Sequence, residues 1–367
     1  MDKDNYSHKL YKHVEDQKKA DALAWSFVNK DKMILFPYQF PVLEDDEVRL
    51  KITYSGLCWS DVSNCRGHWG PKTYPLAPGH EVVGVVTQLG NKVTKFKLGD
   101  KVCLGPQRRS CTKCKVCLSG HENYCRCLDP DQKLTYNLWW GGYSTHMQQP
   151  ESFLFHLPEG IPENVAPPLL CAGVTVWSPI VKYITKGMTT AVLGIGGLGH
   201  LAVQYLAKLG YDVTAITSSL DKVEYIKSLG ATRVINFNSK EDLKTWENKF
   251  DVILNCTSVS GDLDKLVDLA SPLGRIIQVG VPDITDKLKV GNGLVGKGIK
   301  LTGSIIGSPK EIQEMLDFSD KNKIYPLCEE FDFSEFPKAF DHLEHGKPKF
   351  RCVVNIKDYS EKNGYFK

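Results

Sequence analysis

The stretch Thr190-Ala-Val-Leu-Gly-Ile-Gly-Gly-Leu-Gly199 decides the fold of the second half of the chain, because three spaced glycines join an apolar strand to a helix. In a G-x-G-x-x-G turn the first glycine makes the tight bend, and the second lets a pyrophosphate approach the backbone. The third lets helix and strand pack closely, while N–H groups at the helix N-terminus face the phosphates. A purely structural glycine turn is the alternative. The pattern predicts a dinucleotide site formed by Gly194, Gly196, Gly197, Leu198 and Gly199.

Strands and helices alternate around this turn at a steady spacing. Residues 198–209 carry an apolar stripe with a 3.6-residue period, closed by Gly210, which predicts a helix. Six β units of this kind predict a doubly wound parallel sheet. The expected strands are Thr190–Ile195, Asp212–Thr217, Arg233–Phe237, Asp251–Cys256, Arg275–Gly280 and Lys300–Ile305.

The end of the second expected strand indicates which dinucleotide binds. A site for NAD usually places Asp or Glu here, where the carboxylate binds the ribose hydroxyls and repels a 2′-phosphate. In this chain the position is Thr217-Ser218-Ser219, which is neutral and bears hydroxyls, and Lys222 follows one turn later. Small donors and a cation suit a 2′-phosphate, so the sequence favours NADP(H) over NAD(H). A solvated surface lysine is the alternative interpretation of Lys222.

The first part of the chain, residues 22–165, consists of strand-like runs divided by Gly, Pro and Asp. Runs at 47–54, 82–87 and 101–104 predict a compact β barrel. The segment 350–356 is also strand-like, and we expect it to return to this first domain. Residues 1–21 are a polar extension, and a short helix is expected over 11–23.

Composition and charge limit the possible classes of protein. The net charge of +3 gives no argument for nucleic acid or a membrane as partner. No run of 18 residues is apolar, so no membrane-spanning helix is expected. The N-terminal extension lacks the apolar core of a signal peptide, and its acidic residues argue against mitochondrial targeting. We therefore expect a cytoplasmic protein.

Four cysteines have the tight spacing Cys111-x2-Cys114-x2-Cys117-x7-Cys125, in a lobe expected over 108–127. Four thiolates suit Zn²⁺ in a closed tetrahedral site, which leaves no position for water and is therefore structural. A disulfide knot is one alternative, but little else looks secreted; a nucleic-acid zinc module is another, and it needs a free recognition helix. Six further cysteines are expected to be reduced and buried: Cys65, Cys103, Cys127, Cys256, Cys328 and Cys352.

A second constellation is dispersed along the chain, as Cys58-Trp-Ser60-Asp61, Gly79-His80-Glu81-Val-Val-Gly84, and Cys171 just before the dinucleotide fold. Each motif is ambiguous alone, since a lone buried cysteine usually packs as a small apolar residue. Together with the cysteine lobe and the glycine turn, they resemble the zinc-dependent medium-chain alcohol dehydrogenases. The resemblance is closest to the NADP(H)-using, cinnamyl alcohol dehydrogenase-like branch. It runs from about residue 24 to 355 and includes Gly303-Ser-Ile-Ile-Gly-Ser308.

This resemblance implies a catalytic zinc ion held by Cys58, His80 and Cys171, with one coordination position open for a substrate oxygen. It also implies that Glu81 sits behind the metal and approaches it transiently. Asp61 is expected to accept the free ring N–H of His80 and so to fix its tautomer.

The resemblance further implies an α/β fold with a GroES-like β-rich catalytic domain (22–167 and 312–367) and a Rossmann doubly wound cofactor domain (168–311). Two zinc ions per chain are expected, one catalytic and one structural. The implied reaction is hydride transfer between NADP(H) and a primary alcohol or aldehyde. Ser60 matches the hydroxyl that relays the alcohol proton toward the cofactor ribose. The family also implies a homodimer joined through the edge strand near 300–305.

Three features depart from the family pattern. Ser63 stands where many relatives carry a histidine that releases the proton, and Trp59 stands where a smaller or polar residue or His is usual. The loop 126–140 is remodelled, with Leu134 in place of a common tryptophan. The substrate is therefore expected only as a class of aromatic, allylic or aliphatic compounds. Two alternatives are a conjugated-alkene or iminium reductase on the same scaffold and a non-catalytic assembly protein; the intact ligand set argues against both.

Overall fold

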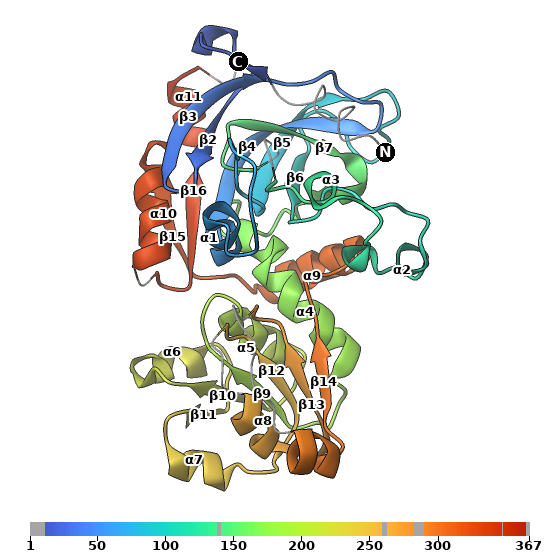
Figure 1. The fold of residues 1–367 in the computed structure, drawn as a ribbon, viewed down its shortest axis with the longest axis vertical. Helices are drawn as coiled ribbons and strands as arrows, with labels where there is room; N and C mark the ends of the chain where they lie inside the picture. The colour runs from blue at the N-terminus through green and yellow to red at the C-terminus, as the bar shows by residue number, and fades with distance from the viewer. Residues whose placement is uncertain (1–11, 138–140, 259–262, 282–289, 347, 365–367) are drawn as a thin grey trace. The chain divides into compact units, whose positions relative to one another are not determined.

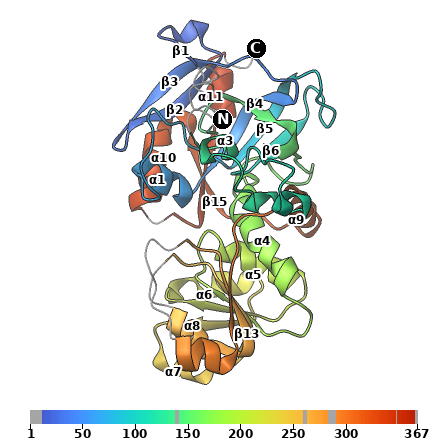
Figure 2. The ribbon, with the colours of Figure 1, turned by 45° about the vertical axis from the view of Figure 1, so that its right-hand side comes forward.

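A computed structural model describes residues 12–137, 141–258, 263–281, 290–346 and 348–364 of the 367-residue chain. The chain divides into two compact units, Met1–Cys171 with Ser308–Lys367, and Ala172–Gly307 (Figures 1 and 2). None of the helices in the described part of the chain combines the length and apolar character needed to cross a bilayer.

The first unit is built on a seven-stranded sheet, as its alternating apolar runs predict. Its strand order is β15-β16-β4-β5-β6-β8, and β7 also pairs with β4. The segment expected to return from the C-terminus does so, because β16 pairs antiparallel with β4. The strands are β4 (Glu47–Leu57), β5 (Val82–Leu89), β6 (Lys101–Leu104), β7 (His146–Pro150), β8 (Phe155–His156), β15 (Cys328–Asp332) and β16 (Arg351–Asn355).

A three-stranded sheet of order β1-β3-β2 lies in the same unit. It consists of β1 (Lys12–His13), β2 (Ala22–Asn29) and β3 (Lys32–Gln39), and the 3-10 turn η3 (Gln17–Lys19) precedes β2. The prediction of a helix over 11–23 is therefore wrong. Residues 22–24 are buried and pair with β3. This tertiary packing favours the extended backbone of a strand over the local preference for a helix.

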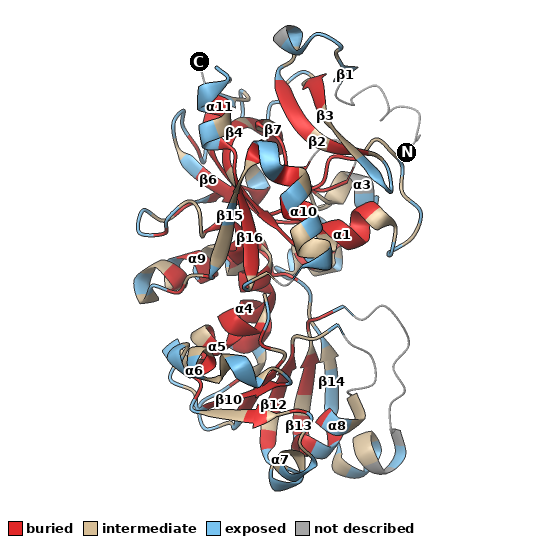
Figure 3. Ribbon diagram, turned by 90° about the vertical axis from the view of Figure 1, so that its left-hand side faces the viewer, coloured by how far each residue is buried: buried red, intermediate tan, exposed pale blue. Residues whose placement is uncertain are grey.

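The helices of the first unit pack along its sheets or follow their ends. Buried residues of β2, β4 and β5 share one apolar core with the α10 residues Phe336 and Phe340 (Figure 3). Phe340 contacts Phe27 of β2, with ring centroids 5.1 Å apart. The helices are α1 (Trp59–Arg66), α2 (Lys115–Leu118), α3 (Pro130–Lys133), α9 (Pro309–Asn322), α10 (Phe336–His345) and α11 (Lys357–Lys362), with the 3-10 turns η4 (Glu122–Tyr124), η5 (Glu151–Phe153), η6 (Pro167–Leu170) and η9 (Phe333–Glu335).

The second unit contains the predicted parallel sheet. All five pairings are parallel, and the strand order is β11-β10-β9-β12-β13-β14. The order reverses at β9, which is where doubly wound sheets bind ligands. The strands are β9 (Thr190–Leu193), β10 (Val213–Thr217), β11 (Arg233–Asn236), β12 (Phe250–Asn255), β13 (Ala270–Gln278) and β14 (Lys300–Gly303), so β13 begins earlier and β14 ends earlier than expected.

Helices connect these strands in the alternation that the sequence predicts. The helix after the glycine turn is α5, and its stripe of buried side chains includes Leu201, Tyr205 and Leu206. The helical segments of this unit are α4 (Ala172–Tyr183), α5 (Gly199–Lys208), η7 (Leu220–Lys222), α6 (Val223–Ser228), α7 (Lys240–Thr245), α8 (Leu263–Leu269) and η8 (Val290–Val295).

Candidate active site and metal centres

Four side chains that are distant in sequence meet in the first unit. Ligand atoms of Cys58, His80, Glu81 and Cys171 all lie within 4.8 Å of one another. Cys58 directly follows β4, the pair His80 and Glu81 directly precedes β5, and Cys171 directly follows η6. The Nε2 atom of His80 lies 3.3 Å from Cys171 Sγ. Two thiols, an imidazole and a carboxylate at this separation match the S, N and O ligands that a zinc ion takes.

Asp61, on the first turn of α1, organises this cluster through both carboxylate oxygens. Its Oδ1 lies 2.9 Å from His80 Nδ1 and accepts the backbone N–H of Gly79 at 3.0 Å. Its Oδ2 accepts the hydroxyl of Tyr143 at 2.6 Å and the backbone N–H of Cys58 at 3.3 Å. Because a carboxylate accepts, the proton of a neutral His80 is on Nδ1, and Nε2 faces the thiols as a lone-pair donor.

The pKa values in the cluster shift in different directions, because the groups share charges and hydrogen bonds. Burial lowers the pKa of His80, but the carboxylate of Asp61 and the neighbouring Cys58 together more than reverse this, so the pKa stands well above its usual value. The hydrogen bond from Cys171 lowers the pKa of Cys58, burial opposes the shift, and the charge of Arg351 adds to it. The same bond raises the pKa of Cys171. Cys58 is therefore the thiol of the pair that ionises more readily.

Arg351, on β16, is a site residue that the sequence interpretation missed. Its Nη2 is paired with Oε1 of Glu81, and both side chains are buried. Burial raises the pKa of Glu81 to about 7, although Arg351 opposes this shift. The other oxygen of Glu81, Oε2, has no hydrogen-bond partner among the residues that the structure describes. Arg351 stands at the start of a strand-like run, and nothing in its local sequence indicates that it faces the cluster.

Tyr143, which directly follows Gly141-Gly142, is a second residue near the cluster that the sequence interpretation missed. It is fully buried, and its hydroxyl also lies 3.1 Å from the backbone oxygen of Gly56. Close packing of the chain explains the glycines, since a Cβ on Gly142 would overlap the side chain of Val82 and one on Gly56 would overlap Glu81. Small residues therefore let β4 and β5 approach the cluster.

The residues beside Cys58 take different positions on α1. Ser60 is partly buried, whereas the side chain of Trp59 is 46% exposed. Ser63 is buried within the helix. The indole of Trp59 is thus available to border an approaching molecule. Trp139 and Trp140 of the remodelled loop lie outside the described residues.

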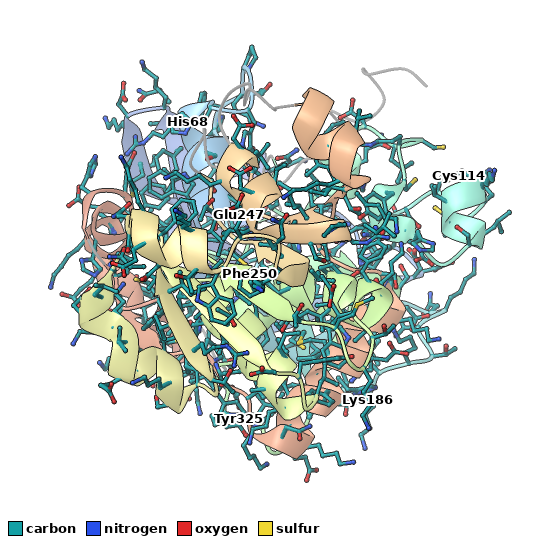
Figure 4. The ribbon with its side chains drawn as sticks, turned by 90° about the horizontal axis from the view of Figure 1, so that it is seen from below. His68, Cys114, Lys186, Glu247, Phe250 and Tyr325 are labelled. Atoms are coloured by element: carbon teal, nitrogen blue, oxygen red, sulfur yellow. The ribbon has the colours of Figure 1, made fainter. Side chains whose placement is uncertain are left out.

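The four lobe cysteines also come together, with their sulfur atoms within 4.8 Å of one another. Cys117 Sγ lies 3.4 Å from Cys114 Sγ and 3.8 Å from Cys111 Sγ. All four are free thiols, so the disulfide alternative is absent from this structure. The backbone N–H of Lys113, together with that of Cys114 at 3.3 Å, lowers the pKa of Cys111 to about 6, although burial opposes this shift. Figure 4 labels Cys114 beside the α2 turn. Four sulfur ligands in this space fit a closed zinc site.

Two arginines tie the start of the lobe to β4. Arg108 Nη2 lies 2.8 Å from Glu47 Oε1, and both side chains are only 4% exposed. Arg109 reaches the same carboxylate at 3.0 Å and Asp46 at 3.3 Å. On the other side, Lys133 donates to the backbone oxygen of Cys125 at 2.8 Å. These ion pairs and hydrogen bonds fix where the lobe leaves and rejoins the sheet.

One cysteine expected to be buried is exposed. Cys127, two residues after Cys125, lies in a bend between η4 and α3. Its thiol interacts with those of Cys111 and Cys114, and these contacts raise the pKa of Cys127 to about 12. The prediction that Cys127 is buried is wrong, because this residue lies in a bend of the remodelled loop and its side chain is exposed. Cys256 and Cys328 are partly exposed, and Cys65, Cys103 and Cys352 are buried as expected.

The glycine turn lies between β9 and α5. Gly194 has φ 85°, which disfavours a side chain, and a Cβ there would meet Thr257. A Cβ on Gly199 would overlap the backbone oxygen of Gly194, so the helix packs closely on the strand. Nothing lies within 4 Å of a Cβ built on Gly196. The turn therefore has one face open and fits a pyrophosphate approaching the backbone, together with Gly197 and Leu198.

The residues predicted to distinguish the two dinucleotides follow β10. Thr217 ends the strand and its hydroxyl accepts the backbone N–H of Ser219 at 3.1 Å, while Ser218 is exposed. Lys222 ends η7 and is partly buried. The first carboxylate after the strand is Asp221, which is exposed. The end of β10 itself is therefore neutral and rich in hydroxyls.

Comparison with known proteins identifies families that match both parts of the chain. Residues 44–159 match the family described as alcohol dehydrogenase GroES-like domain, and residues 197–321 match the zinc-binding dehydrogenase family. Cinnamyl alcohol dehydrogenase 2 of Rauvolfia serpentina is 37% identical over 360 residues, which cover 95% of this chain and 98% of that protein. Vomilenine reductase of the same plant is 37% identical over 346 residues, covering 91% and 95%.

A solved structure agrees with the sequence matches. The cinnamyl alcohol dehydrogenase of Helicobacter pylori, complexed with NADP(H), is 30% identical to this chain with a TM-score of 0.83. The superposition covers 92% of this chain and 98% of that protein. The similarity therefore extends over both units of this chain and is not confined to one of them.

Proposed function

Because the chain belongs to the zinc-dependent medium-chain alcohol dehydrogenases, in their cinnamyl alcohol dehydrogenase-like branch, we propose that it transfers hydride between NADP(H) and a primary alcohol or aldehyde. The substrate is aromatic, allylic or aliphatic. The observation that carries this proposal is the meeting of Cys58, His80 and Cys171 beside Glu81, with Asp61 behind the histidine ring.

The proposed catalytic residues each have a task that their contacts support. Cys58, His80 and Cys171 hold a zinc ion, which polarises the C–O bond of the substrate when bound. Asp61 keeps the His80 proton on Nδ1 and so directs Nε2 to the metal. Glu81 offers its unpartnered Oε2 on the buried side of the site, where Arg351 holds the other oxygen.

Ser60 is the proposed acceptor of the alcohol proton, which it passes toward the cofactor ribose. It lies on the same helical turn as Asp61, two residues after Cys58, and is partly open to solvent. Ser63 is buried and cannot replace the family's histidine as an outlet, so the proton leaves through water.

The proposed cofactor is NADP(H), which supplies the hydride. The neutral, hydroxyl-bearing end of β10 supports this choice, since Thr217, Ser218 and Ser219 place no carboxylate where a 2′-phosphate would lie. Lys222 adds a cation one turn later. Exchanging Ser218 for Asp should raise KM for NADPH and lower it for NADH, and unchanged KM values would contradict the assignment.

Three further properties concern the second metal site, the oligomeric state and the location of the protein. We propose a second, structural zinc ion in the cysteine lobe, and therefore two per chain. We propose a homodimer through β14, an edge strand whose Leu301 and the following Ile305 are 43% and 50% exposed. A cytoplasmic location completes the proposal. Sedimentation of wild type against Leu301→Lys tests the dimer.

Turnover of NADPH with a panel of small aldehydes tests the central proposal, with Cys58→Ser as the control. Product analysis with a conjugated aldehyde separates the alternatives. An alcohol with its C=C bond intact supports the proposal, whereas a saturated aldehyde supports the conjugated-alkene reductase. In a separate assay with an iminium substrate, formation of the amine supports the iminium reductase. No turnover by a fully zinc-loaded protein would favour the non-catalytic assembly protein.

A further inference from the structure

Two side-chain amides join the carboxyl ends of β12 and β13. Asn255 and Gln278 are paired in register at the last position of each strand. Nδ2 of Asn255 donates to Oε1 of Gln278 at 2.6 Å, and Asn255 is only 3% exposed. Strands of a parallel sheet that is covered on both faces usually carry apolar side chains. A buried pair of amides at this place therefore calls for an explanation in terms of what the pair holds.

The amide pair fixes the backbone just beyond both strands. Oδ1 of Asn255 accepts the backbone N–H of Thr257 at 3.1 Å and its hydroxyl at 2.8 Å. Nε2 of Gln278 donates to the backbone oxygens of Thr257 at 3.1 Å and Gly280 at 2.7 Å. The oxygen and the nitrogen of each amide thus have partners, and a buried network that is satisfied in this way is rigid.

The backbone held by this network borders the glycine turn. A Cβ built on Gly194 would lie 2.5 Å from Cγ2 of Thr257, and one built on Gly280 would overlap the backbone oxygen of Thr257. Thr257 is therefore a wall beside the first glycine of the turn, where the strand order reverses. A dinucleotide spans such a point, with one mononucleotide over each half of the sheet. Because the end of β10 is the proposed place of the 2′-phosphate, the nicotinamide half belongs over the ends of β12 and β13.

We propose that Asn255 and Gln278 are positioning residues for the cofactor, which hold Thr257 in the place that the nicotinamide half of NADP(H) requires. They act through the backbone of Thr257 and Gly280, to which their amides are bonded. The inference rests on the proposed cofactor, but not on the substrate or on either metal site. Without the amide pair the wall loosens, and the affinity that the nicotinamide half contributes falls. The adenosine half, on the glycine turn and the end of β10, keeps its contacts.

Isothermal titration calorimetry of the zinc-loaded full-length protein tests the proposal with two ligands. One is NADPH, and the other is adenosine 2′,5′-bisphosphate, which lacks the nicotinamide half. Gln278→Met keeps the length of the side chain but removes every hydrogen bond of the amide, and it should raise Kd for NADPH about ten-fold. Kd for the bisphosphate should not change, because this ligand has no group over β12 and β13.

Thr257→Val is a milder variant, which serves if Gln278→Met does not fold. It keeps a methyl group beside Gly194 but loses the hydroxyl that donates to Asn255, so Kd for NADPH should rise about three-fold. Thr190→Val is its matched control. It removes a hydroxyl that donates to the backbone oxygen of Asp212 at 2.9 Å, at the first residue of β9 and so at the opposite end of the sheet, and both Kd values should stay unchanged.

An unchanged Kd for NADPH in whichever of the two variants folds would overturn the proposal, and so would an equal loss of affinity for both ligands. Wild type should also bind NADPH more tightly than the bisphosphate, since equal affinities would mean that the nicotinamide half makes no contact worth positioning. If wild type binds neither ligand, the proposed cofactor is wrong and the positioning role falls with it. If wild type binds both and the variants match it, the positioning role alone is wrong.

Discussion

Removing the positive charge of Arg351 beside the cluster of Cys58, His80, Glu81 and Cys171 should destabilise the first unit strongly. Arg351 and Glu81 form an ion pair with side-chain exposures of only 6% and 0%. Replacing Arg351 by Met keeps most of the volume but leaves the Glu81 carboxylate buried without its partner. Breaking such a pair costs about 3–5 kcal/mol of unfolding free energy, because the remaining charge keeps its desolvation penalty.

Urea denaturation of wild type, Arg351→Met, Glu81→Gln and the double variant measures this cost. Hydrogen exchange of peptides from β5 and β16 confirms that the affected region is the sheet around the pair. The double variant should cost clearly less than the sum of the single changes, since it leaves no buried charge; a coupling of about 1–3 kcal/mol is expected.

The exposed pair of Arg233 and Asp212 provides the matched control, with side-chain exposures of 40% and 53%. Arg233→Met should cost at most about 1 kcal/mol, because water screens the interaction. If Arg351→Met costs no more than this control, or if its effect simply adds to that of Glu81→Gln, the pair does not compensate two buried charges and the reasoning is wrong.

Three further predictions concern zinc binding, the pH dependence of stability and the anchoring of the cysteine lobe. Tyr143→Phe removes a hydrogen bond to Asp61 and should weaken zinc binding about ten-fold in competition with a chelator. Tyr325→Phe, which removes a hydroxyl that donates to the backbone oxygen of Gly160 at 2.7 Å, should not. Burial, with a smaller effect of Lys51, lowers the pKa of His146 from 6.5 to about 4. The unfolded chain therefore binds more protons between these values, and stability should fall by up to about 3 kcal/mol as pH drops from 6.5 to 4; an equal slope in His146→Gln would refute the assignment. Arg108→Met should leave Glu47 with the partly exposed Arg109 as its remaining ion-pair partner and speed proteolysis of the lobe, whereas Lys92→Met at the exposed Asp45 pair should not.

Periodicity and glycine spacing predict much of the fold because they report local geometry. The six parallel strands and the return of β16 to the first unit follow from alternating apolar runs. The helix expected over 11–23 fails because pairing with β3 is a tertiary effect that no local window contains. For the same reason the length of β13 is set by its neighbour β12, and the pattern alone places its start too late.

The candidate site divides in a similar way. Residues in compact motifs, such as Cys58 and His80, can be grouped from sequence because the motifs carry chemistry that few other roles need. Arg351 and Tyr143 lie far along the chain and have no motif, so only the folded sheet reveals that they hold Glu81 and Asp61. The prediction that Cys127 is buried was wrong because it rested on residue type alone. Cys127 lies in the remodelled loop, where it is exposed.

Zinc stoichiometry by native mass spectrometry tests the central claim most directly. The account predicts two zinc ions per chain in wild type, and one in each of Cys58→Ser and Cys111→Ser, because each variant loses a ligand of a different site. A wild-type chain that carries a single ion, unaffected by Cys58→Ser, would contradict a metal at the cluster of Cys58, His80 and Cys171.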